Sequence, residues 1–151
     1  MRFIFVLLLL PSALCAQTQT RIHVEHQGDD SVGIRFAFAF KEAVRKSTSF
    51  VLVDERKNAL NVDIATEDAW VEGVKLQSPK GSASYLSVAI FINAPAADCS
   101  NAPQEVFVEH KLSMAGSGRV DDAAAGLLAH VDGIMGALRK LPAQGSSASP
   151  H

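Results

Sequence analysis

Histidine and glutamate side chains stand close together in the segment His23-Val24-Glu25-His26. The segment lies in an alternating apolar and polar stretch, and neighbouring side chains of a strand point to opposite faces of a sheet. His23 and Glu25 would therefore share a face that His26 does not. With a third ligand such as His110, these two residues could bind a metal ion. The alternative, which we prefer, is an ordinary pair of polar residues on the solvated face of an edge strand.

A second histidine follows a carboxylate directly, in Glu109-His110. Adjacent residues of a strand face opposite ways, so these two side chains cannot readily act as an acid-base pair. Alternation instead places His110 on one side with Val106, Val108 and Leu112. This pattern predicts a partly buried histidine with a structural role.

Small residues form a narrow stripe on the segment 120–141, which has the spacing of a helix. The stripe contains Gly126, His130, Gly133 and Ala137 at intervals of three and four. Glycine costs a helix up to about 1 kcal/mol relative to alanine, so a close contact is expected to require it. Packing within the chain and a helix contact between two copies both remain open.

No motif of a known catalytic or nucleotide-binding site is present. The chain has no Gly-x-Ser-x-Gly elbow, phosphate loop, dinucleotide fingerprint, zinc-protease helix or calcium loop. Gly116-Ser117-Gly118 is best explained as a turn before a helix. These absences favour a protein without catalytic activity, and we expect no cofactor and no bound metal.

The first sixteen residues have the three-part pattern of a cleavable signal peptide. Arg2 precedes an apolar run from Phe3 to Leu10, and small residues follow Pro11. The run is too short for a spanning helix, which needs about 20 apolar residues. Cys15 occupies a place where a lipidated cysteine could lie, but Leu14 before it is too large for a lipoprotein signal. We therefore expect removal of residues 1–16 and a periplasmic or secreted protein.

Composition predicts one folded domain after the signal. The 151 residues include 14 Lys and Arg against 16 Asp and Glu, and 48% are hydrophobic. This mild acidic balance gives no support for nucleic acid as a partner, and the chain would meet a membrane only through its signal peptide. The domain is expected to span residues 17–142, followed by a disordered tail at 143–151. Cys99 would be a free thiol in the mature chain, because Cys15 leaves with the signal.

Hydrophobic periodicity predicts an α+β fold with the order β-α-β-β-β-β-α. Residues 32–47 fit both alternation and helical spacing, and the basic end of the segment favours a helix. Residues 50–54 and 60–64 are expected to pair as a hairpin. The result is a mainly antiparallel sheet of about five strands with two helices on one face. The predicted strands are 21–26, 50–54, 60–64, 85–93 and 105–114, and the predicted helices are 32–47 and 120–141.

One stretch resembles small modules of bacterial envelope proteins. It consists of a helix ending in Lys41–Ser47, then Ser49-Phe50-Val51-Leu52-Val53-Asp54, then Asn58–Ile64. This is similar to the N-terminal domain of the Tol-system periplasmic protein and to the curli-secretion lipoprotein family. The chain lacks the β-propeller that accompanies the Tol module. The resemblance implies assembly and protein contact without catalysis, and more broadly an exported bacterial protein of unknown function.

The sequence therefore predicts an exported module that binds another envelope or extracellular protein through a sheet edge or an uncovered sheet face. Two alternatives stay open. One is a small hydrolase or metal-binding enzyme that uses His23, Glu25 and His110. The other is a secreted inhibitor or effector. The expected oligomeric state is a monomer or a weak homodimer.

Overall fold

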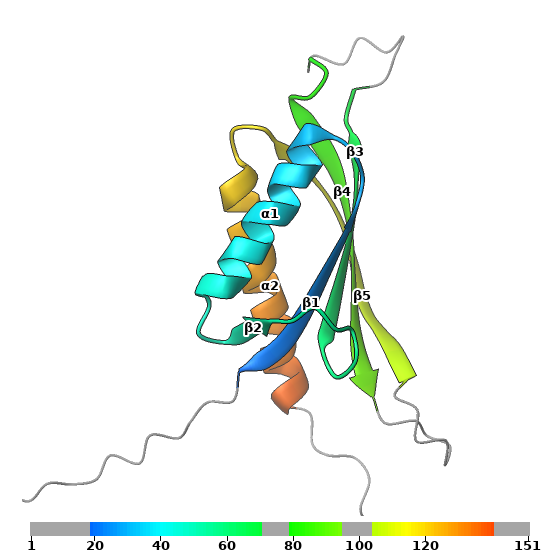
Figure 1. Ribbon diagram of the computed structural model, residues 1–151, viewed down its shortest axis with the longest axis vertical. Helices are drawn as coiled ribbons and strands as arrows, with labels where there is room; N and C mark the ends of the chain where they lie inside the picture. Colours follow the sequence, from blue (N-terminus) through cyan, green and yellow to red (C-terminus); the bar gives the residue numbers. More distant parts are fainter. Residues whose placement is uncertain (1–18, 71–78, 95–103, 141–151) are drawn as a thin grey trace, which may run out of the picture.

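Five strands and two helices make up the part of the chain that the computed structural model describes, residues 19–70, 79–94 and 104–140 (Figure 1). The predicted signal peptide, Cys99 and the tail at 143–151 lie outside these residues. The predicted α+β class and element order are confirmed. In chain order the elements are β1 (Thr20–Gln27), α1 (Ser31–Lys46), β2 (Phe50–Leu52), β3 (Leu60–Asp68), β4 (Ala83–Ala94), β5 (Gln104–Gly116) and α2 (Val120–Lys140).

The strands form one mixed sheet in the order β2-β1-β3-β4-β5. β3, β4 and β5 are antiparallel neighbours, as expected, whereas β1 runs parallel to both β2 and β3. The predicted hairpin between residues 50–54 and 60–64 is wrong, because β1 lies between the two strands. Both strands run parallel to β1, so the connection from Val53 to Ala59 has to cross β1 instead of folding back beside β2.

Both helices cover the same face of the sheet. Asp30 caps the N-terminus of α1, and its Oδ1 accepts a hydrogen bond of 2.6 Å from the backbone N–H of Gly33. Phe36, Phe40 and Val44 of α1 are buried against the strands, which settles the ambiguous segment as a helix. The buried residues of α2 follow a helical spacing of four, three and four: Val120, Ala124, Leu127 and Val131.

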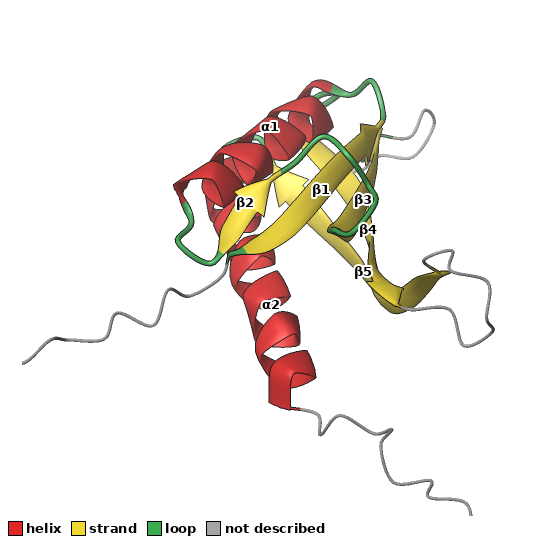
Figure 2. Cartoon of the chain, turned by 60° about the horizontal axis from the view of Figure 1, so that its bottom comes forward, coloured by secondary structure: helices red, strands yellow, loops and turns green. Residues whose placement is uncertain are grey.

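Alternation along the strands gives the sheet two different faces. Ile22, Val62, Ile64, Val88 and Ile90 point toward the helices and are almost completely buried. The side chains between them point to the opposite face, called here the open face, which neither described helix covers (Figure 1). Figure 2 shows that α2 extends beyond the strands at its C-terminal end. Neither described helix is long and apolar enough to cross a membrane.

Candidate functional site

Three large side chains on the open face are exposed side by side. Tyr85 on β4 is directly opposite Met114 on β5, and Leu112 is opposite Ser87 in the same register. Their exposed fractions are 49% for Tyr85, 73% for Leu112 and 61% for Met114. They border a groove of about 700 Å³, called here the apolar groove, whose remaining lining is Ala65, Thr66, Glu67, Leu86, Ser87 and Ser113. An exposed apolar patch of this kind is typical of a contact site.

Small residues in the middle of the sheet extend this groove toward β1. Ala65 on β3 is paired with Ser87 on β4, and Ala89 lies two residues further along β4. A second hollow of about 230 Å³ begins at Ala65 and Ser87 and is bordered by Glu25, Gln27, Asp63, Ile64 and Ala89. The two hollows share Ala65 and Ser87, so they lie next to each other on the open face. We call the second one the acidic hollow.

Arg56 holds the β2–β3 connection across the open face beside the acidic hollow. Its guanidinium Nη1 donates hydrogen bonds of 2.8 Å to both Glu25 and Asp63, and its Nη2 donates one of 3.0 Å to Glu105. Hydrogen bonds to Asp63 and Glu105 raise the pKa of Arg56, although burial opposes this. Three carboxylates thus surround one cation, so the cluster keeps a net negative charge.

Backbone contacts fix the same connection. The side-chain amide of Asn93 on β4 donates hydrogen bonds of 2.8 Å to the carbonyl of Arg56 and 3.0 Å to that of Ala59. Val53 donates its backbone N–H to the carbonyl of Ile22 at 2.9 Å. The connection therefore forms a fixed border at one end of the open face.

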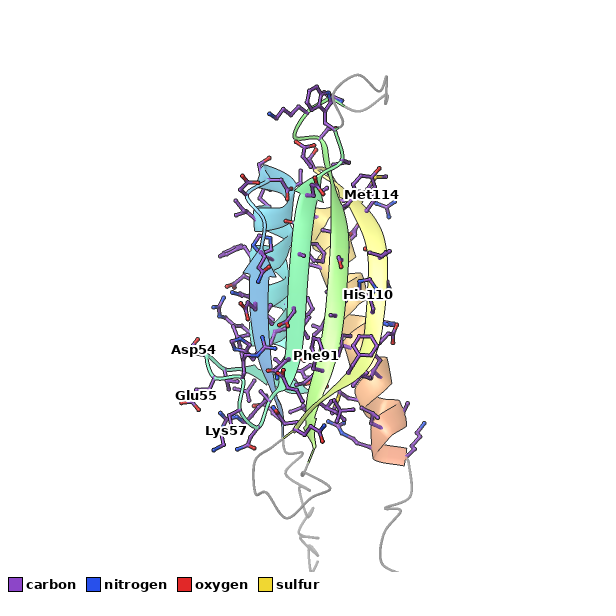
Figure 3. All side chains as sticks on the ribbon, turned by 90° about the vertical axis from the view of Figure 1, so that its right-hand side faces the viewer. Asp54, Glu55, Lys57, Phe91, His110 and Met114 are labelled. Carbon is purple, nitrogen blue, oxygen red and sulfur yellow. The ribbon has the colours of Figure 1, made fainter. Side chains whose placement is uncertain are left out.

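A β-bulge decides which residues of β5 reach the open face. The register between β4 and β5 shifts between Ile90 and Phe91, so that Glu109 pairs with Ile90 but Phe107 pairs with Phe91. The rings of Phe91 and Phe107 lie edge to face with centroids 5.8 Å apart. Figure 3 shows Phe91, His110 and Met114 along this side of the sheet. β5 is also an end strand of the described sheet, so its outer edge has no strand partner there.

The bulge also corrects the prediction for His110. This residue is exposed rather than partly buried, and its Nε2 lies 2.8 Å from the hydroxyl of Ser87 on the open face. The extra residue at Val108 reverses the alternation, so His110 and Leu112 face away from the helices while Val108 packs against the core. A regular strand would have kept all three on one side.

The structure does not bring the three metal candidates together. Nδ1 of His23 lies 3.3 Å from the carbonyl of Val53, and Glu25 is engaged with Arg56. β1 and β5 are separated by two strands, which places His110 roughly 14 Å from the other two in the direction across the sheet. Within the described ranges there is no group of three or more His, Cys, Asp or Glu that could hold a metal ion.

His26 belongs to a polar cluster on the helix side that the sequence did not reveal. Its Nε2 lies 2.9 Å from the hydroxyl of Thr66, at the far end of β3. Burial lowers the pKa of His26, and the nearby Asp30 partly offsets this. Burial of Asp30 would raise the pKa of its carboxyl, but hydrogen bonds from Thr66, Gly33 and Ser84 outweigh burial and lower it. The cluster ties the start of α1 to the ends of β1 and β3.

The small-residue stripe of α2 is largely exposed. Gly126, Gly133 and Ala137 are exposed, and a methyl group added at either glycine would meet no described atom within 4 Å apart from its chain neighbours and the nearby backbone of its own helix. His130 is half-buried, and its Nε2 lies 2.8 Å from Oε1 of Glu109 on β5. Close packing within the described chain therefore does not account for the two glycines. A helix contact between two copies remains a prediction.

Comparison with known proteins gives little further identification. No protein family model matches the chain, and no curated protein matches it. A solved structure titled as that of a "putative lipoprotein" from Caulobacter crescentus CB15 aligns with 81% of this chain and 93% of its own, at 10% identity and a TM-score of 0.30. At this TM-score the likeness carries no argument about the fold or the function.

Proposed function

We propose that this chain is an exported, non-catalytic module that binds another protein through the open face of its sheet. The observation that carries the proposal is the exposure of Tyr85, Leu112 and Met114 together around one groove. An antiparallel sheet with one solvated face normally carries polar side chains on that face. Covering large apolar side chains on that face with a partner would remove them from water, which is favourable.

The shape of the face also supports a protein partner. The apolar groove lies next to the acidic hollow, and the small residues Ala65 and Ser87 line both. Three carboxylates of this face gather around Arg56, and His110 is not part of that group, so the face does not combine a histidine with carboxylates at one point as an acid-base site would. His110 contacts Ser87, whereas Glu25 contacts Arg56. An elongated, partly apolar surface suits a contact between proteins better than it suits a reaction.

Two expectations from the sequence agree with this proposal. The signal-peptide pattern of residues 1–16 would deliver the domain to the envelope or the medium. The segment that resembles Tol and curli-secretion modules implies a role in assembly and protein contact. Its Phe50–Leu52 and Leu60–Ile64 portions lie in β2 and β3, the strands on either side of β1.

Affinity capture with paired variants tests the proposal. The mature protein, bearing a C-terminal tag, is used to capture partners from its own envelope fraction, alongside Leu112→Asp and Phe38→Asp. Both residues are large, apolar and exposed, but Phe38 lies on α1, on the other side of the molecule. We expect Leu112→Asp to lose a partner that wild type and Phe38→Asp retain. Equal capture by all three proteins would contradict binding at the open face.

A further inference from the structure

We infer that the partner segment bound by the open face carries an apolar side chain and, a few residues away, a lysine or arginine. The inference rests on the proposed function and adds the chemistry of the partner. It follows from the position of the two hollows next to each other and from the difference in charge between them.

The apolar groove would take the uncharged part of such a segment. Its walls are Tyr85, Leu112 and Met114, and among the described residues of its lining Glu67 is the one ionisable group apart from the Tyr85 phenol. Burying a Leu or Phe side chain of a partner there would remove apolar surface of both molecules from water, which favours binding. Glu67 is exposed at the groove margin, on the strand that continues to Asp63.

The acidic hollow would take the cation. Glu25 and Asp63 border it, and Glu105 joins them through Arg56. One guanidinium cannot neutralise three carboxylates, so this part of the open face attracts positive and repels negative side chains. Salt bridges at an exposed surface contribute modestly to affinity, but like charges placed together disfavour the wrong partner strongly.

The distance between the two hollows sets the spacing within the segment. The groove is lined by β3, β4 and β5 and the hollow by β1, β3 and β4, so their middles lie one strand apart across the sheet and two residues apart along it, or about 8 Å in all. An extended chain covers about 10 Å in three residues. A basic residue about three positions from the apolar one would therefore reach Glu25 and Asp63.

Fluorescence anisotropy with three labelled, end-blocked peptides tests the inference. Each has Leu-Phe at one end and Ser-Ser in the middle, and the other end is Lys-Lys, Ser-Ser or Glu-Glu. We expect the lysine peptide to bind the mature protein about tenfold or more tightly than the glutamate peptide. Added salt should narrow this difference, because exposed charges are screened.

Charge-removing variants locate the effect. Glu25→Gln, which removes a charge from the acidic hollow, should weaken binding of the lysine peptide about two- to fivefold. Asp132→Asn removes the same charge from an exposed position on α2 and should leave binding unchanged. Leu112→Ser should weaken binding of all three peptides, whereas Phe38→Ser should not.

Two results would overturn the inference. In the first, all three peptides bind equally and Leu112→Ser weakens each of them; the open face then binds apolar segments without a charge preference, and the proposed function stands. In the second, no peptide binds the wild-type protein, which excludes a short segment of this chemistry. The envelope capture with Leu112→Asp then decides the proposed function separately.

Discussion

Truncation of Phe40 should separate the buried side of α1 from its exposed side. Phe40 is fully buried in the core between α1 and the sheet, whereas Phe38, two residues earlier on the same helix, is 65% exposed. A buried phenylalanine removes about 150–250 Å² from water, worth roughly 4–6 kcal/mol at 25 cal/mol per Å². We therefore expect Phe40→Ala to cost about 3–5 kcal/mol, as large-to-small core substitutions do.

The same substitution at Phe38 is the matched control. Little area is buried there, and alanine favours a helix more than phenylalanine does, so the unfolding free energy should change by less than about 0.5 kcal/mol. Urea unfolding of the mature protein, followed by circular dichroism, measures both values. In a domain of this size, Phe40→Ala should lower Tm by roughly 10–20 °C. Equal losses for the two variants would refute the orientation of α1 and, with it, the assignment of the open face.

Two further predictions concern the polar cluster and the glycines. Gly33→Ala should destabilise the fold, because the added methyl group would collide with the Thr66 hydroxyl and the Asp30 carboxylate. Gly133→Ala should instead stabilise the fold by about 0.5–1 kcal/mol, since that position is helical and open. Burial lowers the pKa of His26, so the His26 imidazole takes up a proton less readily in the folded state than in the unfolded state. The free energy of unfolding should therefore fall as the pH drops through and below the usual pKa of histidine. Urea midpoints at several pH values would measure this dependence of stability on pH, which should disappear in His26→Gln. The same dependence in that variant would assign it to another group.

The helices and the strand count were predictable because their signals are local. Asp121 and Asp122 mark the start of α2, Arg139 and Lys140 mark its end, and the apolar spacing between them needs no knowledge of the rest of the chain. The same holds for the basic last turn of α1. Both helices appear within one or two residues of their predicted bounds.

The place of β1 was not predictable in the same way. Parallel pairing of Ile22 with both Leu52 and Leu60 joins segments 30 or more residues apart, and alternation within a strand says nothing of its neighbours. Short connections favoured a hairpin, and the Arg56 contacts that hold the crossing connection are visible only in three dimensions.

The apolar groove was not predictable from the sequence because of one extra residue in β5. Alternation without interruption put Leu112 on the side of Val106 and Val108, and the bulge near Val108 reversed that assignment. No glycine or proline marks the bulge, so the sequence carried no signal for it. Alternation without the bulge places Leu112 and Met114 on the side of Val106 and Val108, so the sequence did not predict that they lie beside Tyr85 on an exposed surface.

Site-specific photo-crosslinking in living cells tests the central claim most directly. A photoreactive phenylalanine analogue is placed at Leu112 in one strain and at Phe38 in another, at two exposed apolar positions on opposite sides of the molecule. Binding at the open face predicts a discrete crosslinked partner from position 112 and none from position 38. The same partner crosslinked from position 38 alone would contradict the account and move the contact to the helical side.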